Sequence, residues 1–140
     1  MSRVLFCHDN ADFATTRGEI LQKLFGHEVI VCTTARASLE KVSRGINAFD
    51  AAIIHKDLGL GIEAIDSDNV VTQIHESAPH VRIGIISGEF PDGRDHVVQV
   101  LQADFYLEPN TDLDWCSRQI ALGPVLPAEM NKRGKSVEMP

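Results

Sequence analysis

Five short apolar runs, each rich in branched or aromatic residues, recur along the chain and constrain its fold more than any other feature. They are nearly continuous in apolar character, which is typical of strands covered on both faces in a parallel sheet. The sequence therefore predicts five buried strands, over residues 3–7, 28–32, 50–54, 82–86 and 104–107.

A segment with helical periodicity follows each of these runs. In the first, Phe13, Ile20, Leu21, Leu24 and Phe25 share one face, before a Gly26 suited to a helix end. The other four segments span residues 35–44, 68–77, 93–102 and 111–122. Parallel neighbours need crossover connections, so this alternation predicts a doubly wound α/β fold: a three-layer, flavodoxin-like sandwich around five parallel strands.

Length and composition fit one domain. The chain has 140 residues, 44% of them hydrophobic, which is enough for one core. The helical and strand patterns stop at Gly123, and Pro124 and Pro127 follow among scattered charges. We therefore expect one domain over residues 1–123 and a flexible tail over residues 124–140.

Charge and hydropathy restrict the expected partners. Lys and Arg number 13 against 20 for Asp and Glu, a net charge of −7 that opposes direct binding to nucleic acid. No apolar stretch approaches the roughly 20 residues of a membrane span, and no export signal is visible. We expect a cytoplasmic protein that does not bind membranes.

Cys7 and Cys32 lie in apolar runs, as buried thiols do, and no CxxC pair is present.

Open α/β sheets place their sites at the carboxyl ends of the strands. The polar residues that follow the predicted strands are His8, Asp9, His55, Asp57, Ser87 and Glu108. Because the first and third strands are neighbours in this architecture, we expect the two histidines and the two aspartates to share one pocket.

Over about residues 2–122 the sequence resembles the receiver domains of two-component response regulators. The resemblance rests on VLFCHDN at 4–10, FDAAIIH at 49–55, IISG at 85–88 and ADFYLEP at 103–109. In that family the first strand normally ends in two magnesium-binding acids, and the third ends in the aspartate that accepts a phosphoryl group. A hydroxyl residue follows the fourth strand, and a lysine precedes the proline after the fifth.

Three of those five positions are changed here. His8, His55 and Glu108 stand where the family has acid, acid and lysine, whereas Asp9 and Ser87 keep the expected types. Phosphoryl transfer needs cations to neutralise charge on the phosphate oxygens. Glu108 places a negative charge where the family has the positive charge of a lysine. The resemblance thus implies a stand-alone pseudo-receiver: not an enzyme, without a cofactor or metal, and acting through protein contacts without aspartyl phosphorylation.

Two alternatives stay open. If the third strand carries a bulge, Asp57 becomes the acceptor and the protein is a true phospho-receiver. Alternatively His8, Asp9, His55 and Asp57 could bind zinc or another transition metal, although their spacing matches no metal motif.

The histidines also predict a pocket sensitive to pH near neutrality, in which we expect the carboxylates to favour charged imidazoles.

Two aromatic residues are the candidates for a contact surface. Tyr106 occupies a place where many receivers carry an aromatic on their interaction face, and Trp115 lies in the last predicted helix. Aromatic side chains are enriched at binding hot spots. We expect this face to dock a signalling protein or a second copy of the chain as a homodimer.

Overall fold

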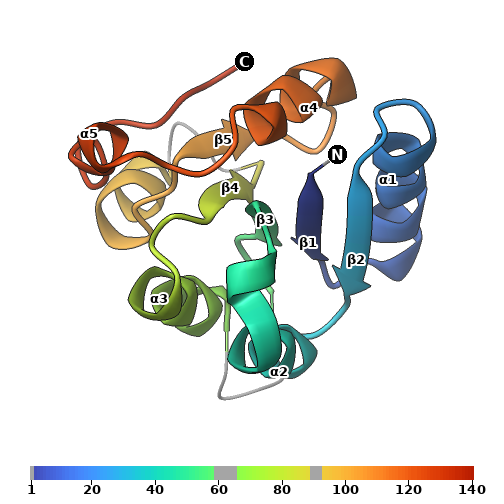
Figure 1. The fold of residues 1–140 in the computed structure, drawn as a ribbon, viewed down its shortest axis with the longest axis horizontal. Coiled ribbons are helices and arrows are strands. Elements are labelled where there is room, and N and C mark those ends of the chain that lie inside the picture. The colour runs from blue at the N-terminus through green and yellow to red at the C-terminus, as the bar shows by residue number, and fades with distance from the viewer. Residues whose placement is uncertain (1, 59–65, 89–92) are drawn as a thin grey trace.

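The computed structural model describes residues 2–58, 66–88 and 93–140, and its centre is a five-stranded sheet (Figure 1). The strands are β1 (Arg3–Cys7), β2 (Glu28–Cys32), β3 (Ala51–His55), β4 (Arg82–Ile86) and β5 (Phe105–Leu107). All described pairings are parallel, in the order β2-β1-β3-β4-β5. This order confirms the doubly wound α/β fold that the sequence predicts.

Four of the five described α-helices begin after a residue whose side chain caps them. The five are α1 (Ala11–Lys23), α2 (Ala35–Gly45), α3 (Ser67–Ser77), α4 (Leu113–Ala121) and α5 (Pro127–Met130), with a short 3-10 turn, η1 (Ile46–Ala48), after α2. The side chains of Asn10, Thr34 and Asp66 each accept a hydrogen bond from a backbone N–H of the first turn that follows. These bonds satisfy donors that a helix start leaves unpaired.

The strands send alternate side chains to two separate cores. Leu5 and Cys7 pack with residues of α2 and α3, whereas Val4 and Phe6 pack with residues of α1 and α4. Both faces of the sheet are therefore covered, which explains why the strand sequences are apolar throughout. The sheet with these two helical layers is the predicted three-layer arrangement.

The segment predicted as a helix over residues 93–102 contains a wider turn. Residues His96–Val100 form a π-helix, η2, in which the Leu101 N–H donates to the His96 carbonyl at 2.8 Å. Gln102 then adopts a φ of 53°, the left-handed conformation that commonly ends a helix. The helical periodicity identified this element, but it does not specify how wide its turns are.

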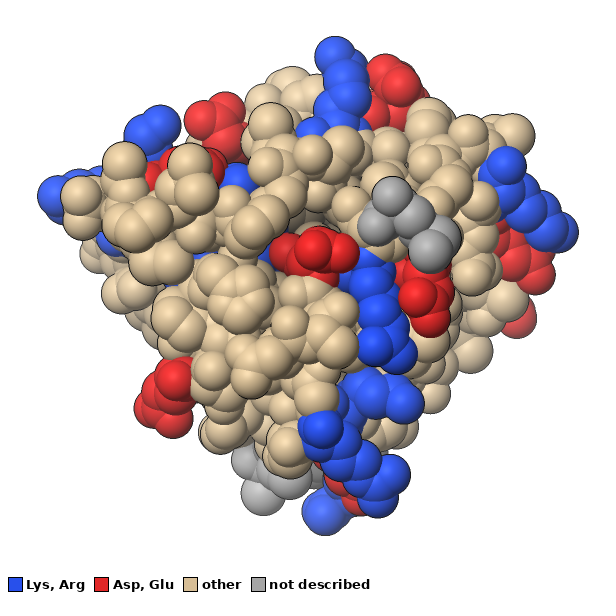
Figure 2. All heavy atoms as spheres, viewed as in Figure 1, with Lys and Arg blue, Asp and Glu red and all other residues tan. Residues whose placement is uncertain are grey.

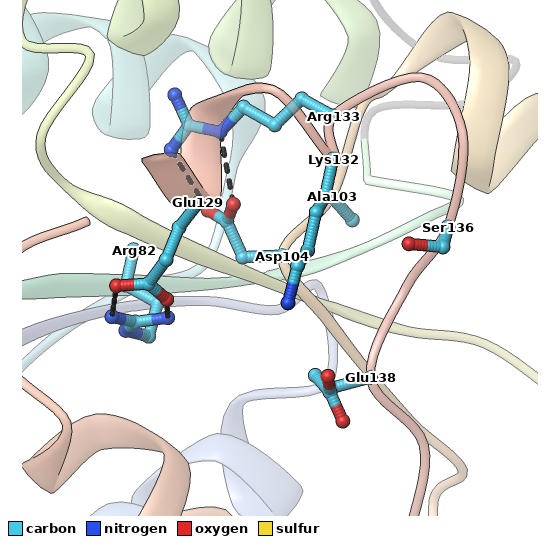
Figure 3. Close-up of a pocket in the computed structure, with 8 residues that line it drawn as sticks. All are labelled: Arg82, Ala103, Asp104, Glu129, Lys132, Arg133, Ser136 and Glu138. Atoms are coloured by element: carbon cyan, nitrogen blue, oxygen red, sulfur yellow. Dashed lines mark hydrogen bonds and ion pairs between the residues drawn. The ribbon is translucent and has the colours of Figure 1, made fainter. Parts of the chain in front are cut away.

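The C-terminal segment, residues 124–140, differs from the expected loose tail because it packs on the amino ends of β4 and β5. Arg133 donates to the carboxylate of Asp104, and Arg82 donates to that of Glu129 (Figure 3). The Tyr106 N–H donates to the Glu138 carbonyl at 2.9 Å, which extends the pairing of the β5 edge. Paired charges and backbone bonds attach a segment whose polar composition alone suggested disorder.

The described helices include none with the length and apolar character that crossing a bilayer requires. On the face of the molecule seen in Figure 2, acidic and basic side chains lie beside one another. The acidic net charge therefore does not appear there as a continuous patch of one sign.

Candidate functional site

The carboxyl ends of β1 and β3 bring two histidines together. Cys7 pairs with Ile54 in the parallel register, so the residues that follow them, His8 and His55, stand side by side. Their rings are stacked, with centroids 4.2 Å apart and planes 20° apart. The ring of Phe13, from the first turn of α1, lies 4.6 Å from that of His8. Sheet register thus builds an aromatic stack at the predicted edge.

One carboxylate oxygen lies close to both imidazoles. Asp9 Oδ1 lies 3.3 Å from Nδ1 of His8 and 3.2 Å from Nδ1 of His55. His8 Nδ1 also accepts the Asn10 N–H at 3.0 Å, so a neutral His8 carries its proton on Nε2. Among the described residues, His55 Nδ1 is buried and has no hydrogen-bond partner, so its contact with Asp9 is a close approach of the two atoms.

The environment keeps His8 neutral. Burial and, to a smaller extent, the neighbouring His55 together lower the pKa of His8 to about 4, although Asp9 acts in the opposite direction. The His8 side chain is only 9% exposed, and desolvation penalises its charged form. The expectation that carboxylates would favour a charged imidazole is therefore wrong for His8, since burial outweighs the single nearby carboxylate.

Asp57 does not join this cluster. The pairing of β3 with β4 runs without interruption to His55 and Ile86, so β3 carries no bulge. Asp57 falls in the turn after the strand and lines a separate hollow together with Asp66, Asp68 and His96. Of the four side chains expected in one pocket, the structure gathers three.

Ser87 and Glu108 follow β4 and β5 as predicted, in different surroundings. Ser87 is 1% exposed, and its backbone N–H donates to the Leu107 carbonyl at 3.0 Å. Glu108 is exposed, and its N–H donates to Thr111 Oγ1 at 2.8 Å. Its side chain lines a small, mainly apolar hollow that also includes Phe13.

The two aromatic candidates for a contact surface differ in burial. Tyr106 is fully buried, and its hydroxyl donates to the Ser87 carbonyl. It therefore belongs to the core, and its placement on an interaction face is wrong, because both faces of the sheet are covered and the C-terminal segment pairs with β5 beside it. Trp115 is half-buried and packs edge-on against Phe105, with centroids 6.3 Å apart.

Sequence reasoning missed three neighbours of the site. Asn10 caps α1 and donates its N–H to His8, Phe13 contacts the His8 ring, and Arg17 lies over Phe13 and donates to the Pro109 carbonyl at 3.0 Å. The capping position of Asn10 was readable from the sequence as a polar residue before a helical segment. The two contacts made from α1 depend on tertiary packing.

The hollow in Figure 3 lies at the opposite, amino-terminal edge of β4 and β5. Its arginines, Arg82 and Arg133, already pair with Glu129 and Asp104. These two arginines are therefore already engaged by carboxylates of the chain itself, as charges that hold a fold together are. The carboxyl edge is therefore the candidate functional site.

Neither a protein-family model nor a curated protein matches the sequence. The fold, by contrast, is similar to solved receiver structures. A response regulator receiver domain protein from Clostridium thermocellum has a TM-score of 0.72 at 16% identity, over 94% of this chain and 95% of that one. A CheY-like receiver protein from Methanospirillum hungatei has a TM-score of 0.69 at 16% identity, over 87% and 95%.

A third similar structure is the receiver domain of a sensor histidine kinase from Pseudomonas aeruginosa, solved with a magnesium ion in its active-site cleft. Its TM-score is 0.71 at 17% identity, over 86% of this chain and 95% of that one. These similarities show that the chain has the receiver fold.

Proposed function

We propose that this protein is a signalling domain of the two-component receiver type that acts through protein contacts and does not take up a phosphoryl group on an aspartate. We propose no catalytic activity for it. Its partner is a signalling protein or a second copy of the chain, and nucleic acid and membranes are not direct partners.

The observation that carries the proposal is the residue at the end of β3. The receiver fold would present its phosphoryl acceptor there, and this chain presents the imidazole of His55, stacked on His8. A carboxylate that lies close to it, that of Asp9, follows β1 and is 3.2 Å from His55 Nδ1. Glu108, after β5, adds negative charge where phosphoryl transfer needs a cation.

The proposed contact surface is the side of the domain formed by α4, on which Trp115 is half-buried. A partly exposed tryptophan offers a large apolar area at low entropic cost, as interface anchors do. Arg118 and Asp114, one turn apart on the same helix, are exposed and form an ion pair at 3.2 Å. We expect an apolar anchor with a polar rim.

The proposal is tested by incubating the protein with acetyl phosphate and Mg²⁺ and measuring its intact mass. The expected result is no gain of a phosphoryl group. Stoichiometric labelling, mapped to Asp57 by peptide analysis, would instead show that the protein is a true phospho-receiver that uses the turn after β3.

A gain-of-function variant provides the matched control. The triple substitution His8→Asp, His55→Asp and Glu108→Lys restores the acids and the lysine that the receiver pattern has at these positions. If the fold is otherwise competent, this variant accepts a phosphoryl group under conditions in which the wild type does not. Labelling of the variant alone would support the proposal.

A further inference from the structure

We propose that His8, Asp9 and His55 form a binding site for one late first-row transition-metal ion, with Zn²⁺ as the representative ion. The inference goes beyond the proposed signalling function and does not depend on it. Within residues 2–58, 66–88 and 93–140, this is the group of potential ligands whose donor atoms come close enough together, within 4.8 Å of one another.

The ligand spacing fits such an ion. Two atoms that each lie about 2.1 Å from one ion at a tetrahedral angle are about 3.4 Å apart. Asp9 Oδ1 lies 3.3 Å from Nδ1 of His8 and 3.2 Å from Nδ1 of His55. The carboxylate oxygen therefore already stands at a ligand-to-ligand distance from both imidazole nitrogens.

The state of the donor atoms supports the same conclusion. Among the residues that the structure describes, His55 Nδ1 is buried and has no hydrogen-bond partner, although buried polar atoms are rarely left unpaired. An ion would supply its missing partner. His8 Nδ1 accepts the N–H of Asn10 in a part-buried hydrogen bond, which an ion that takes the lone pair would replace.

Binding requires one ring to turn. The histidine rings are stacked, whereas an ion lies in the plane of each imidazole that binds it. The torsion that turns a histidine ring is intrinsically broad, so the turn itself needs no strained rotamer. His55 is the ring with more room, because its side chain is 19% exposed against 9% for His8. Asp9 is 54% exposed, which gives an ion a path from solvent and room for water ligands.

The donor set selects the class of ion. Imidazole nitrogen suits Zn²⁺, Cu²⁺ and Ni²⁺, whereas Mg²⁺ prefers an octahedral set of oxygen ligands. Two nitrogens and one carboxylate oxygen therefore favour Zn²⁺ over Mg²⁺. Thiolates do not compete at this site, because Cys7 is fully buried and burial raises the pKa of its thiol to about 12.

The test is calorimetric titration of chelator-treated, full-length protein with Zn²⁺, and separately with Mg²⁺. We expect saturable binding of one Zn²⁺ per chain, an increase in Tm with Zn²⁺ concentration, and no binding of Mg²⁺ over the same range. Titration with Co²⁺ should give visible ligand-field bands without a thiolate charge-transfer band. The absence of a one-to-one Zn²⁺ isotherm, or tighter binding of Mg²⁺, would overturn the proposal.

Variants at the more exposed ligands keep the test independent of folding. Asp9→Asn and His55→Gln should each weaken Zn²⁺ binding about tenfold or more. His96→Gln is the matched control, because His96 pairs with Asp68 at 3.1 Å in the hollow away from β1. Unchanged binding in His55→Gln, or an equal loss in His96→Gln, would overturn the proposal. Zinc binding and acetyl phosphate labelling are separate measurements, so failure of one proposal does not imply failure of the other.

Discussion

Arg133 holds Asp104 through two hydrogen bonds of 2.9 and 2.8 Å, and both side chains are only 7% exposed. Arg133 also donates to the carbonyls of Pro79 and Val81, while Asp104 accepts the N–H of Ile83. This pair attaches the C-terminal segment to the start of β5. The segment is therefore part of the folded domain.

Removing Arg133 should destabilise the protein strongly. Arg133→Ala leaves the Asp104 carboxylate buried without its cation, and breaking such a pair costs about 3–5 kcal/mol. Denaturant unfolding would measure the loss. Lys135→Ala, at an exposed position of the same segment, is the control and should change stability by less than about 0.5 kcal/mol. A loss in Arg133→Ala as small as that in Lys135→Ala would show that the segment contributes little to stability.

Substitutions of Tyr106 should lower stability whether or not the protein associates. Tyr106→Ala empties a fully buried aromatic site, at a cost of about 3–5 kcal/mol. Tyr106→Phe removes only the hydroxyl that donates to the Ser87 carbonyl, at a cost of about 1 kcal/mol. Thermal melts at several protein concentrations would separate a loss of folding stability from a loss of self-association. A Tyr106→Ala variant with wild-type stability and weaker self-association would restore the interface interpretation.

Gly84 is required by the ring of Phe105. A Cβ added at Gly84 would lie 2.2 Å from Phe105 Cε2, in the middle of the sheet. Gly84→Ala should therefore cost about 1–3 kcal/mol or more, as overpacking does. Adding Phe105→Leu should recover part of that loss in a double-mutant cycle. At Gly45 an added Cβ meets no atom within 4 Å, so Gly45→Ala should be much milder.

Acidification should weaken the fold through His8. The folded pKa of His8, about 4, lies below its ordinary value of 6.5, so the unfolded chain binds its proton first as pH falls. The stability contributed by neutral His8 is fully present above pH 6.5 and is lost between there and about pH 4. Its slope is at most about 1.4 kcal/mol per pH unit.

Unfolding curves from pH 7 to pH 5, with a chelator present, test this expectation against a His8→Gln variant. The wild type should lose more stability over this range than the variant does. His27 and His75, whose pKa values burial also lowers, are present in both proteins and cancel in the comparison. Parallel slopes would show that His8 titration is not coupled to folding.

The sequence by itself determined the elements and their order. Apolar runs, helical periodicity, capping residues such as Asn10 and end signals such as Gly26 act over a few residues, so they predict strands and helices locally. The general location of the site followed as well, because parallel strands all end at one edge. His8, Asp9 and His55 were identified at this level.

Tertiary structure decided the remaining features. The register of β1 against β3 stacks His8 on His55, and the uninterrupted pairing of β3 with β4 places Asp57 in another hollow. The pairing of Arg133 with Asp104 turned an apparent tail into packed structure. Each of these contacts joins residues far apart in the chain. Local pattern carries no information about such contacts, because register, burial and charge pairing are set only when the elements pack together.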